Sequence, residues 1–196
     1  MKKVVFIMFV LAIGACASAT VRIIVEGQNG LAAIKYATDG EKVRAFALDV
    51  KLSAGTFTGI SDYIKGESTI VEPNHLGYGI FPARFSQYVS VDAQTGEVTS
   101  WDVNDYNPLA DPCDPGSLGG LGTGGVTLEM GALYYPPEDS SPNAPLNTGL
   151  LCKLAISQTA KVTVTPNAIR GGIVLTDPTK PATMDWTQAT NIQINK

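Results

Sequence analysis

The sequence predicts an all-β protein, a single jelly-roll-like β-sandwich of about nine strands that follows an N-terminal signal peptide. Apolar and polar residues alternate with a period of two along most of the chain, which is typical of half-buried strands. Glycine, proline, asparagine and aspartate separate these segments, and the chain contains 20 Gly and 12 Pro. Helical periodicity is weak throughout, since Gly66 interrupts the best helical candidate, residues 61–72. Many short strands separated by turns favour a sandwich or jelly roll.

The N-terminal residues have the layout of a secretory signal peptide. Lys2 and Lys3 precede an apolar run at 4–13, and small residues follow it. The run is too short to be a good membrane-spanning helix. The triplet Ala17-Ser18-Ala19 favours cleavage directly before Thr20. We therefore expect the protein to be secreted, to the extracellular space or the cell surface.

This cleavage divides the chain into a signal peptide, residues 1–19, and one sandwich domain, residues 20–196. An alternative is that Ile13-Gly14-Ala15-Cys16, which resembles a lipoprotein box, carries a lipid on Cys16. No apolar run after the leader is long enough to span a bilayer.

Without its two leader lysines the chain keeps 14 − 2 = 12 basic and 18 acidic residues, a net charge of −6. An acidic surface without a basic run argues against nucleic acid and anionic membrane as partners.

The alternating segments predict the strands in order along the chain, including two strands around a turn at 93–96. The predicted strands are 21–25, 31–37, 44–53, 55–60, 76–82, the pair within 88–103, 126–135, 149–157, 161–166 and 171–177. Period two assigns one face of four of these strands to the core. The residues expected there are Phe46, Leu48, Val50 and Leu52; Val126, Leu128, Met130, Ala132 and Tyr134; Leu150, Cys152, Leu154 and Ile156; and Val162 with Val164.

Gly120, Gly122 and Gly125 have the GxGxxG spacing that is found in nucleotide-binding loops. Such a loop must follow a strand and open a helix, so that helix N–H groups face the pyrophosphate. Here a loop sequence precedes the glycines and an alternating strand follows them. We interpret this stretch as a loop without a phosphate site.

The Gly-, Pro- and Asp-rich stretch 104–125 is long for a loop in a compact domain, and long loops are often functional. Oxygen ligands cluster around it: Asp102, Asn104, Asp105, Asp111 and Asp114. Carboxylates and amides suit Ca²⁺, although the spacing does not fit an EF-hand. Aspartate and asparagine are also ordinary turn formers, so turn chemistry is the alternative to calcium.

Two cysteines, Cys113 and Cys152, remain after the leader. An even pair in a secreted chain predicts one disulfide, which would tie the long loop to a strand. A metal pair or a reactive thiol is the alternative interpretation.

No catalytic constellation is recognisable, so we expect no enzyme activity. His75 is the only histidine, and no GxSxG elbow accompanies it. The chain has too few histidines for a His-based zinc site. Exposed aromatic side chains could stack on sugar rings, and packing in the core is their alternative role. The candidate ligand-binding residues are Trp101, Tyr106, Tyr134 and Tyr135, and Trp186 belongs to the same aromatic set.

Two segments carry a family resemblance. RAFALDVKLSAGTFTGISDY, residues 44–63, resembles the early strand pair of cohesin-type domains, and GLLCKLAISQTAKVTVTPNAIRGGIVLTD, residues 149–177, resembles their ending. Cohesin-like domains group with certain carbohydrate-binding modules. The resemblance implies a non-catalytic module that holds a dockerin partner, another secreted protein, or a polysaccharide at the bacterial cell surface. A structural subunit of an extracellular matrix or coat, and a polysaccharide-acting enzyme, are the alternatives.

Overall fold

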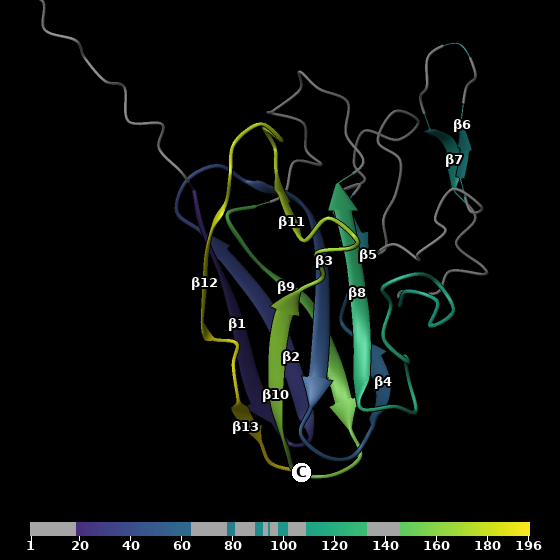
Figure 1. Cartoon of the computed structure of the whole chain (residues 1–196), viewed down its shortest axis with the longest axis vertical. Coiled ribbons are helices and arrows are strands. Elements are labelled where there is room, and N and C mark those ends of the chain that lie inside the picture. The colour runs from purple at the N-terminus through teal and green to yellow at the C-terminus, as the bar shows by residue number, and fades with distance from the viewer. Residues whose placement is uncertain are drawn as a thin grey trace, which may run out of the picture.

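In the computed structural model the chain forms two β-sheets that pack face to face (Figure 1). The structure describes residues 19–63, 78–80, 89–91, 94, 98–101, 109–132 and 146–196. Strands β3, β8 and β10 lie in front of β1, β2 and β9 in Figure 1. The prediction of an all-β sandwich is confirmed.

The first sheet has five strands in the order β12-β1-β2-β9-β4. Their bounds are β12 Thr183–Gln188, β1 Thr20–Gln28, β2 Leu31–Thr38, β9 Thr148–Ile156 and β4 Phe57–Ser61. All neighbours are antiparallel except β12 and β1, which run parallel. Asn29 and Gly30 close the β1–β2 hairpin with φ values of 49° and 73°. Two positive φ values in a two-residue loop fit a type I′ turn, for which Asn-Gly is the preferred sequence.

The second sheet has six strands, ordered β13-β10-β3-β8-β5 with β11 also paired to β3. Their bounds are β13 Ile192–Ile194, β10 Ala160–Pro166, β3 Val43–Leu52, β8 Gly125–Ala132, β5 Tyr78–Ile80 and β11 Ile173–Leu175. The predicted strand pair around residue 94 is present as β6, Val89–Val91, and β7, Val98–Trp101. From β2 to β4, and again from β8 to β10, each strand lies in the opposite sheet from the one before it. This wrapping agrees with the predicted jelly-roll-like arrangement.

The core lies between the sheets and follows the predicted alternation closely. On β3 and β8 most of the side chains expected in the core are buried: Phe46, Leu48, Val50, Val126, Leu128 and Met130. Leu52 is partly buried against the core, the side chain of Ala132 is not described, and Tyr134 lies outside the described residues. Of the outward residues in between, Asp49 and Glu129 are partly covered and Lys51 is exposed, whereas Ala47 and Thr127 are buried. The ring of Tyr36 packs on that of Phe46 with centroids 5.0 Å apart, and its hydroxyl donates to the Leu146 carbonyl at 2.8 Å.

One predicted core position on β9 is wrong because of a β-bulge. The β2–β9 register pairs Ile34 with Cys152 but Lys35 with Leu150, so Leu151 is the extra residue. A bulge reverses the alternation beyond it. Leu151 is therefore the buried residue, whereas Leu150 lies half-buried on the outer face.

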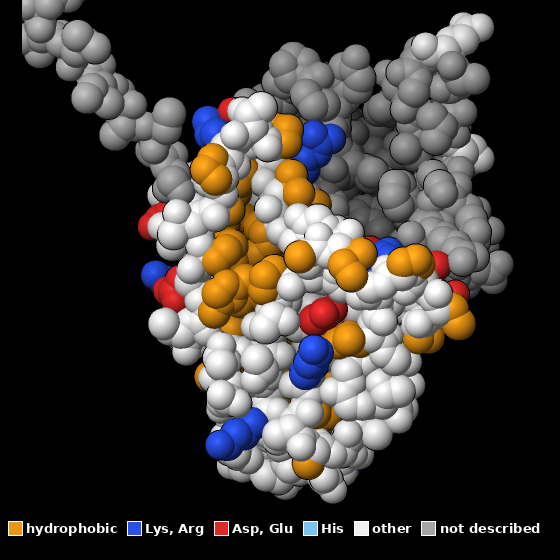
Figure 2. Space-filling model, viewed as in Figure 1, with side chains coloured by type: hydrophobic (Ala, Val, Ile, Leu, Met, Phe, Trp, Pro, Cys, Tyr) orange, Lys and Arg blue, Asp and Glu red, His pale blue; other side chains and the backbone are white. Residues whose placement is uncertain are grey.

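Apolar side chains also gather along the seam between β12 and β10 (Figure 2). The partly buried residues that pack against the core include Ile173, Met184, Trp186 and Ile192. Trp186 is thus a packing residue at the edge of the core, the second of its two predicted roles.

The predicted disulfide is not formed, since Cys113 and Cys152 are both free. Cys152 is fully buried between the sheets, next to Ile34 across the strand pair. Cys113 is exposed in the loop, where its N–H donates to Asp111 Oδ1 at 2.8 Å. The thiols therefore lie in different environments, one in the core and one at the surface. Burial raises the pKa of the Cys152 thiol.

We expect one thiol of the native exported protein to react with a maleimide or an aromatic disulfide reagent. Cys113 is exposed and reacts, whereas Cys152 is shielded and held protonated, and only the thiolate is nucleophilic. Counting labels by mass spectrometry before and after unfolding in denaturant should give one and then two. Absence of labelling in denaturant without reductant would mean that the sulfurs are bonded.

Candidate functional site

The glycine-rich stretch is a loop, as predicted. Gly116, Gly120 and Gly122 have φ values between 76° and 84°, a region that favours glycine. Thr123 Oγ1 lies 2.8 Å from both the Gly120 and Gly125 carbonyls. Strand β8, and no helix, follows from Gly125. The GxGxxG spacing therefore provides no helix N-terminus for a phosphate.

A polar network ties this loop to the outer face of the six-stranded sheet. Asp49 Oδ1 on β3 accepts hydrogen bonds from Thr127 Oγ1 at 2.7 Å and from Asn167 Nδ2 at 3.0 Å. Asn167 Nδ2 also donates to the Gly116 carbonyl, and Thr127 Oγ1 accepts from the Leu118 N–H at 2.9 Å. Thr127 and Asn167 are only 1% and 3% exposed, because the loop covers them.

A half-buried ion pair extends the network along β8. Arg170 Nε donates to Glu129 Oε1, and this hydrogen bond raises the pKa of Arg170. The same guanidinium donates through Nη1 to the Pro115 carbonyl at 3.1 Å. Ala47, which points outward from β3, is also buried. The outer face of this sheet is therefore covered by loop residues around β3 and β8.

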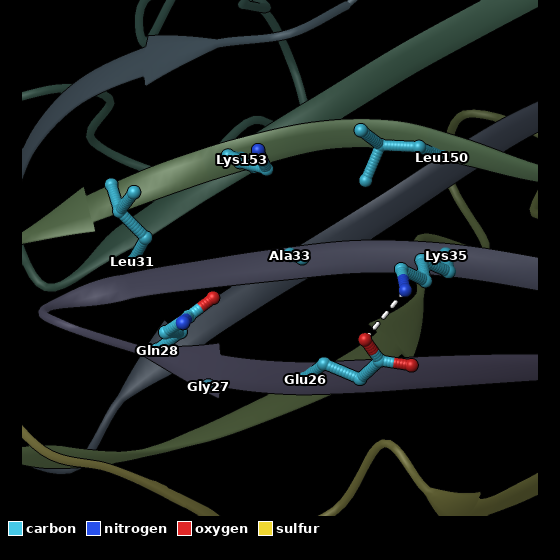
Figure 3. Close-up of a pocket in the computed structure, with 8 residues that line it drawn as sticks. All are labelled: Glu26, Gly27, Gln28, Leu31, Ala33, Lys35, Leu150 and Lys153. Atoms are coloured by element: carbon cyan, nitrogen blue, oxygen red, sulfur yellow. Dashed lines mark hydrogen bonds and ion pairs between the residues drawn. The ribbon is translucent and has the colours of Figure 1, made fainter.

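The five-stranded sheet carries a shallow trough on its outer face, enclosing about 590 Å³. Strands β1, β2 and β9 supply its eight lining residues, shown in Figure 3: Glu26, Gly27, Gln28, Leu31, Ala33, Lys35, Leu150 and Lys153. Ala33 lies at the centre, with Glu26 beside it on β1 and Lys153 beside it on β9. The trough exists because a methyl group stands among longer side chains.

Charged side chains form the rim of the trough. Lys35 Nζ donates to Glu26 Oε2 at 2.5 Å, the contact drawn in Figure 3. Lys153 Nζ lies 2.5 Å from Asp62 Oδ2, at the end of β4. The four side chains are 36% to 59% exposed, so each pair contributes about 0–1 kcal/mol to stability. The charged groups of both pairs therefore stay accessible to solvent beside the apolar floor of the trough.

The shape of the trough and the polarity of its lining residues are suited to binding another molecule. Its floor is aliphatic, from Leu31, Ala33 and Leu150, and its rim carries both signs of charge. None of the eight lining residues is aromatic, so the trough offers no platform on which a sugar ring could stack.

Most candidate residues from the sequence fall outside the part of the chain that can be described. Trp101 lies in β7 opposite Val89 of β6, and its side chain is among those not described. Tyr106, Tyr134, Tyr135 and His75 also lie outside the described residues. Their proposed roles stay predictions.

The calcium prediction is only partly open to inspection, since Asp102, Asn104 and Asp105 lie outside the described residues. Asp111 accepts a backbone hydrogen bond through Oδ1, and Asp114 is buried. Within the described ranges, no three His, Cys, Asp or Glu side chains are grouped so that they could hold a metal ion. In the same ranges, no helix is long and apolar enough to cross a membrane.

Two solved structures are similar to this chain. The solution structure of CaCohA2 from Clostridium acetobutylicum matches at 16% identity and a TM-score of 0.38, covering 90% of each chain. A crystal structure of CaCohA2 in complex with CaDoc0917 matches at 13% identity and the same TM-score, over 90% of this chain and 99% of that one. No family model and no curated protein sequence matches. A similarity at these values does not identify a binding surface. A binding surface has to be inferred from the residues of this chain.

Proposed function

We propose that this chain is a secreted, non-catalytic, cohesin-like module that binds a protein partner through the trough on its five-stranded sheet. The trough itself is the observation that supports the proposal. Protein interfaces combine an apolar centre with a polar, solvent-accessible rim, and the floor around Ala33 with its charged rim has this composition. Three paired strands make the surface rigid, so little order is lost on binding.

The choice of sheet follows from what covers each outer face. Loop residues bury Ala47, Thr127 and Asn167 on the six-stranded sheet. All eight lining residues of the trough are partly or fully exposed. A partner therefore reaches the β1–β2–β9 surface without displacing a hydrogen-bonded loop. The predicted signal peptide supports the further proposal that the protein is secreted and acts at the cell surface.

A polysaccharide partner receives no support from the trough, because its lining has no aromatic ring. Sugar binding would have to use aromatic residues outside the described part of the chain. Protein binding and glycan binding are therefore separable by experiment.

Replacing Ala33 by Arg should abolish partner binding while the fold is kept. The new side chain fills the centre of the trough, but it points to solvent from a half-buried position, so the core is unchanged. Immobilised wild-type protein is used to capture proteins secreted by the native host, and the captured protein is identified and purified. We expect its affinity for the Ala33→Arg variant to fall at least about tenfold, since a blocked interface centre costs more than 1.4 kcal/mol.

The matched control is Thr165→Arg, which adds an arginine at an exposed position of β10 in the other sheet. It should bind like the wild type. Equal binding by both variants would reject the trough as the interface. Retention on insoluble cellulose or chitin, with no protein captured, would contradict a protein-binding function.

A further inference from the structure

The first residue that the structure describes is Ala19, which directly precedes the predicted cleavage site. Ala19 is 2% exposed and lies directly before β1, in which the buried side chains of Val21 and Ile23 follow at the same spacing of two. Gly40 packs so closely that a side chain added there would lie 3.2 Å from Ala19 Cα and Cβ. Ala19 is therefore part of the packed domain.

Ala19 also supports the edge of the five-stranded sheet. Its carbonyl accepts a hydrogen bond from the Thr183 N–H at 2.9 Å, where β12 begins to pair with β1. Strand β12 is held to the sheet on one side only, as the terminal strand in the order. Removal of Ala19 would take away this bond at the start of the parallel pair and would open the methyl-sized space beside Gly40.

Cleavage before Thr20 would bring one compensating contact. The Thr20 N–H donates to Asp39 Oδ1 at 2.8 Å, so a new terminal ammonium would stand next to this carboxylate. Asp39 is exposed, however, and exposed ion pairs contribute little. The buried contacts of Ala19 outweigh this gain.

We infer that processing of the leader leaves Ala19 in the mature chain. The sequence offers two upstream sites that do so. Ala15-Cys16-Ala17 is a second small-x-small triplet, with cleavage before Ser18, and the lipoprotein-like box places the cut before Cys16. In both cases the mature protein keeps Ala19.

The test is the intact mass of the protein exported from the full-length chain. We expect a mass that corresponds to a start at Ser18, or to a lipid-modified start at Cys16, and partitioning into detergent distinguishes these two. Either start supports the inference. A mass that corresponds to a start at Thr20 overturns it.

A second measurement tests the physical basis. Domains that start at Ser18, Ala19 and Thr20 are prepared from a cleavable fusion and melted under the same conditions. The first two should melt together, and the Thr20 form about 3–6 °C lower, the shift expected for a modest loss in a domain of this size. Equal melting temperatures for all three would contradict the role given to Ala19.

Discussion

Replacing Leu154 by Ala should lower the free energy of unfolding by about 2–5 kcal/mol. Leu154 on β9 is fully buried between the sheets, with Ala32 and Ile60 as its neighbours across the two strand pairs. The loss combines the transfer free energy of the removed methyl groups with the cavity that they leave, because a packed core collapses only partly. Urea unfolding of wild type and variant, followed by tryptophan fluorescence or circular dichroism, measures the difference.

Leu146→Ala is the matched control, since Leu146 lies just before β9 and is 73% exposed. The same chemical change there should alter stability by less than about 0.5 kcal/mol. Similar effects at both positions would mean that Leu154 is not in the core, and the assigned register of β9 would have to be abandoned.

Replacing Asn167 by Ala should lower stability by about 2–4 kcal/mol and release the loop from the six-stranded sheet. Its side chain donates to Asp49 and to the Gly116 carbonyl, and accepts from the Arg170 N–H at 3.1 Å. The variant removes these three hydrogen bonds from partly buried groups, of which Asp49 keeps its bond from Thr127. A buried group that loses its partner costs about 1–3 kcal/mol. Hydrogen exchange of residues 109–124 should become faster than in the wild type.

Asn147→Ala serves as its control, because Asn147 is exposed and lies before β9. Exchange in residues 109–124 should not change in this variant. If the Asn167→Ala protein shows wild-type exchange in the loop, the network does not hold the loop down.

The fold was largely predictable from periodicity, because each central strand carries three or more apolar residues on one face. Strand β12 was missed even though Met184 and Trp186 alternate with polar residues, since two apolar positions are too few to stand out. Strand β13 is shorter still. The bulge at Leu151 could not be predicted, because it arises from the pairing of β9 with β2 and leaves no mark in β9 itself.

The trough was not predicted for a related reason. Its floor is made by apolar residues at outward positions: Leu31, Ala33 and Leu150. A period of two separates the two faces of a strand, but it identifies the outward face only once the inward face is known. The proximity of these residues depends on the register of three strands, of which β9 lies more than a hundred residues after β2. The Asp49–Thr127–Asn167 network joins three distant segments in the same way. Apolar outward positions on LAAIKYA were the one available signal.

The most direct test of the proposed function is to map the interface of the captured partner on this chain by hydrogen exchange or NMR chemical-shift perturbation. The account predicts that binding protects or shifts β1, β2 and β9 around Glu26, Ala33 and Lys153, and leaves the outer face of β3, β8 and β10 unchanged. Protection confined to β3, β8 and β10, with an unperturbed trough, would contradict it.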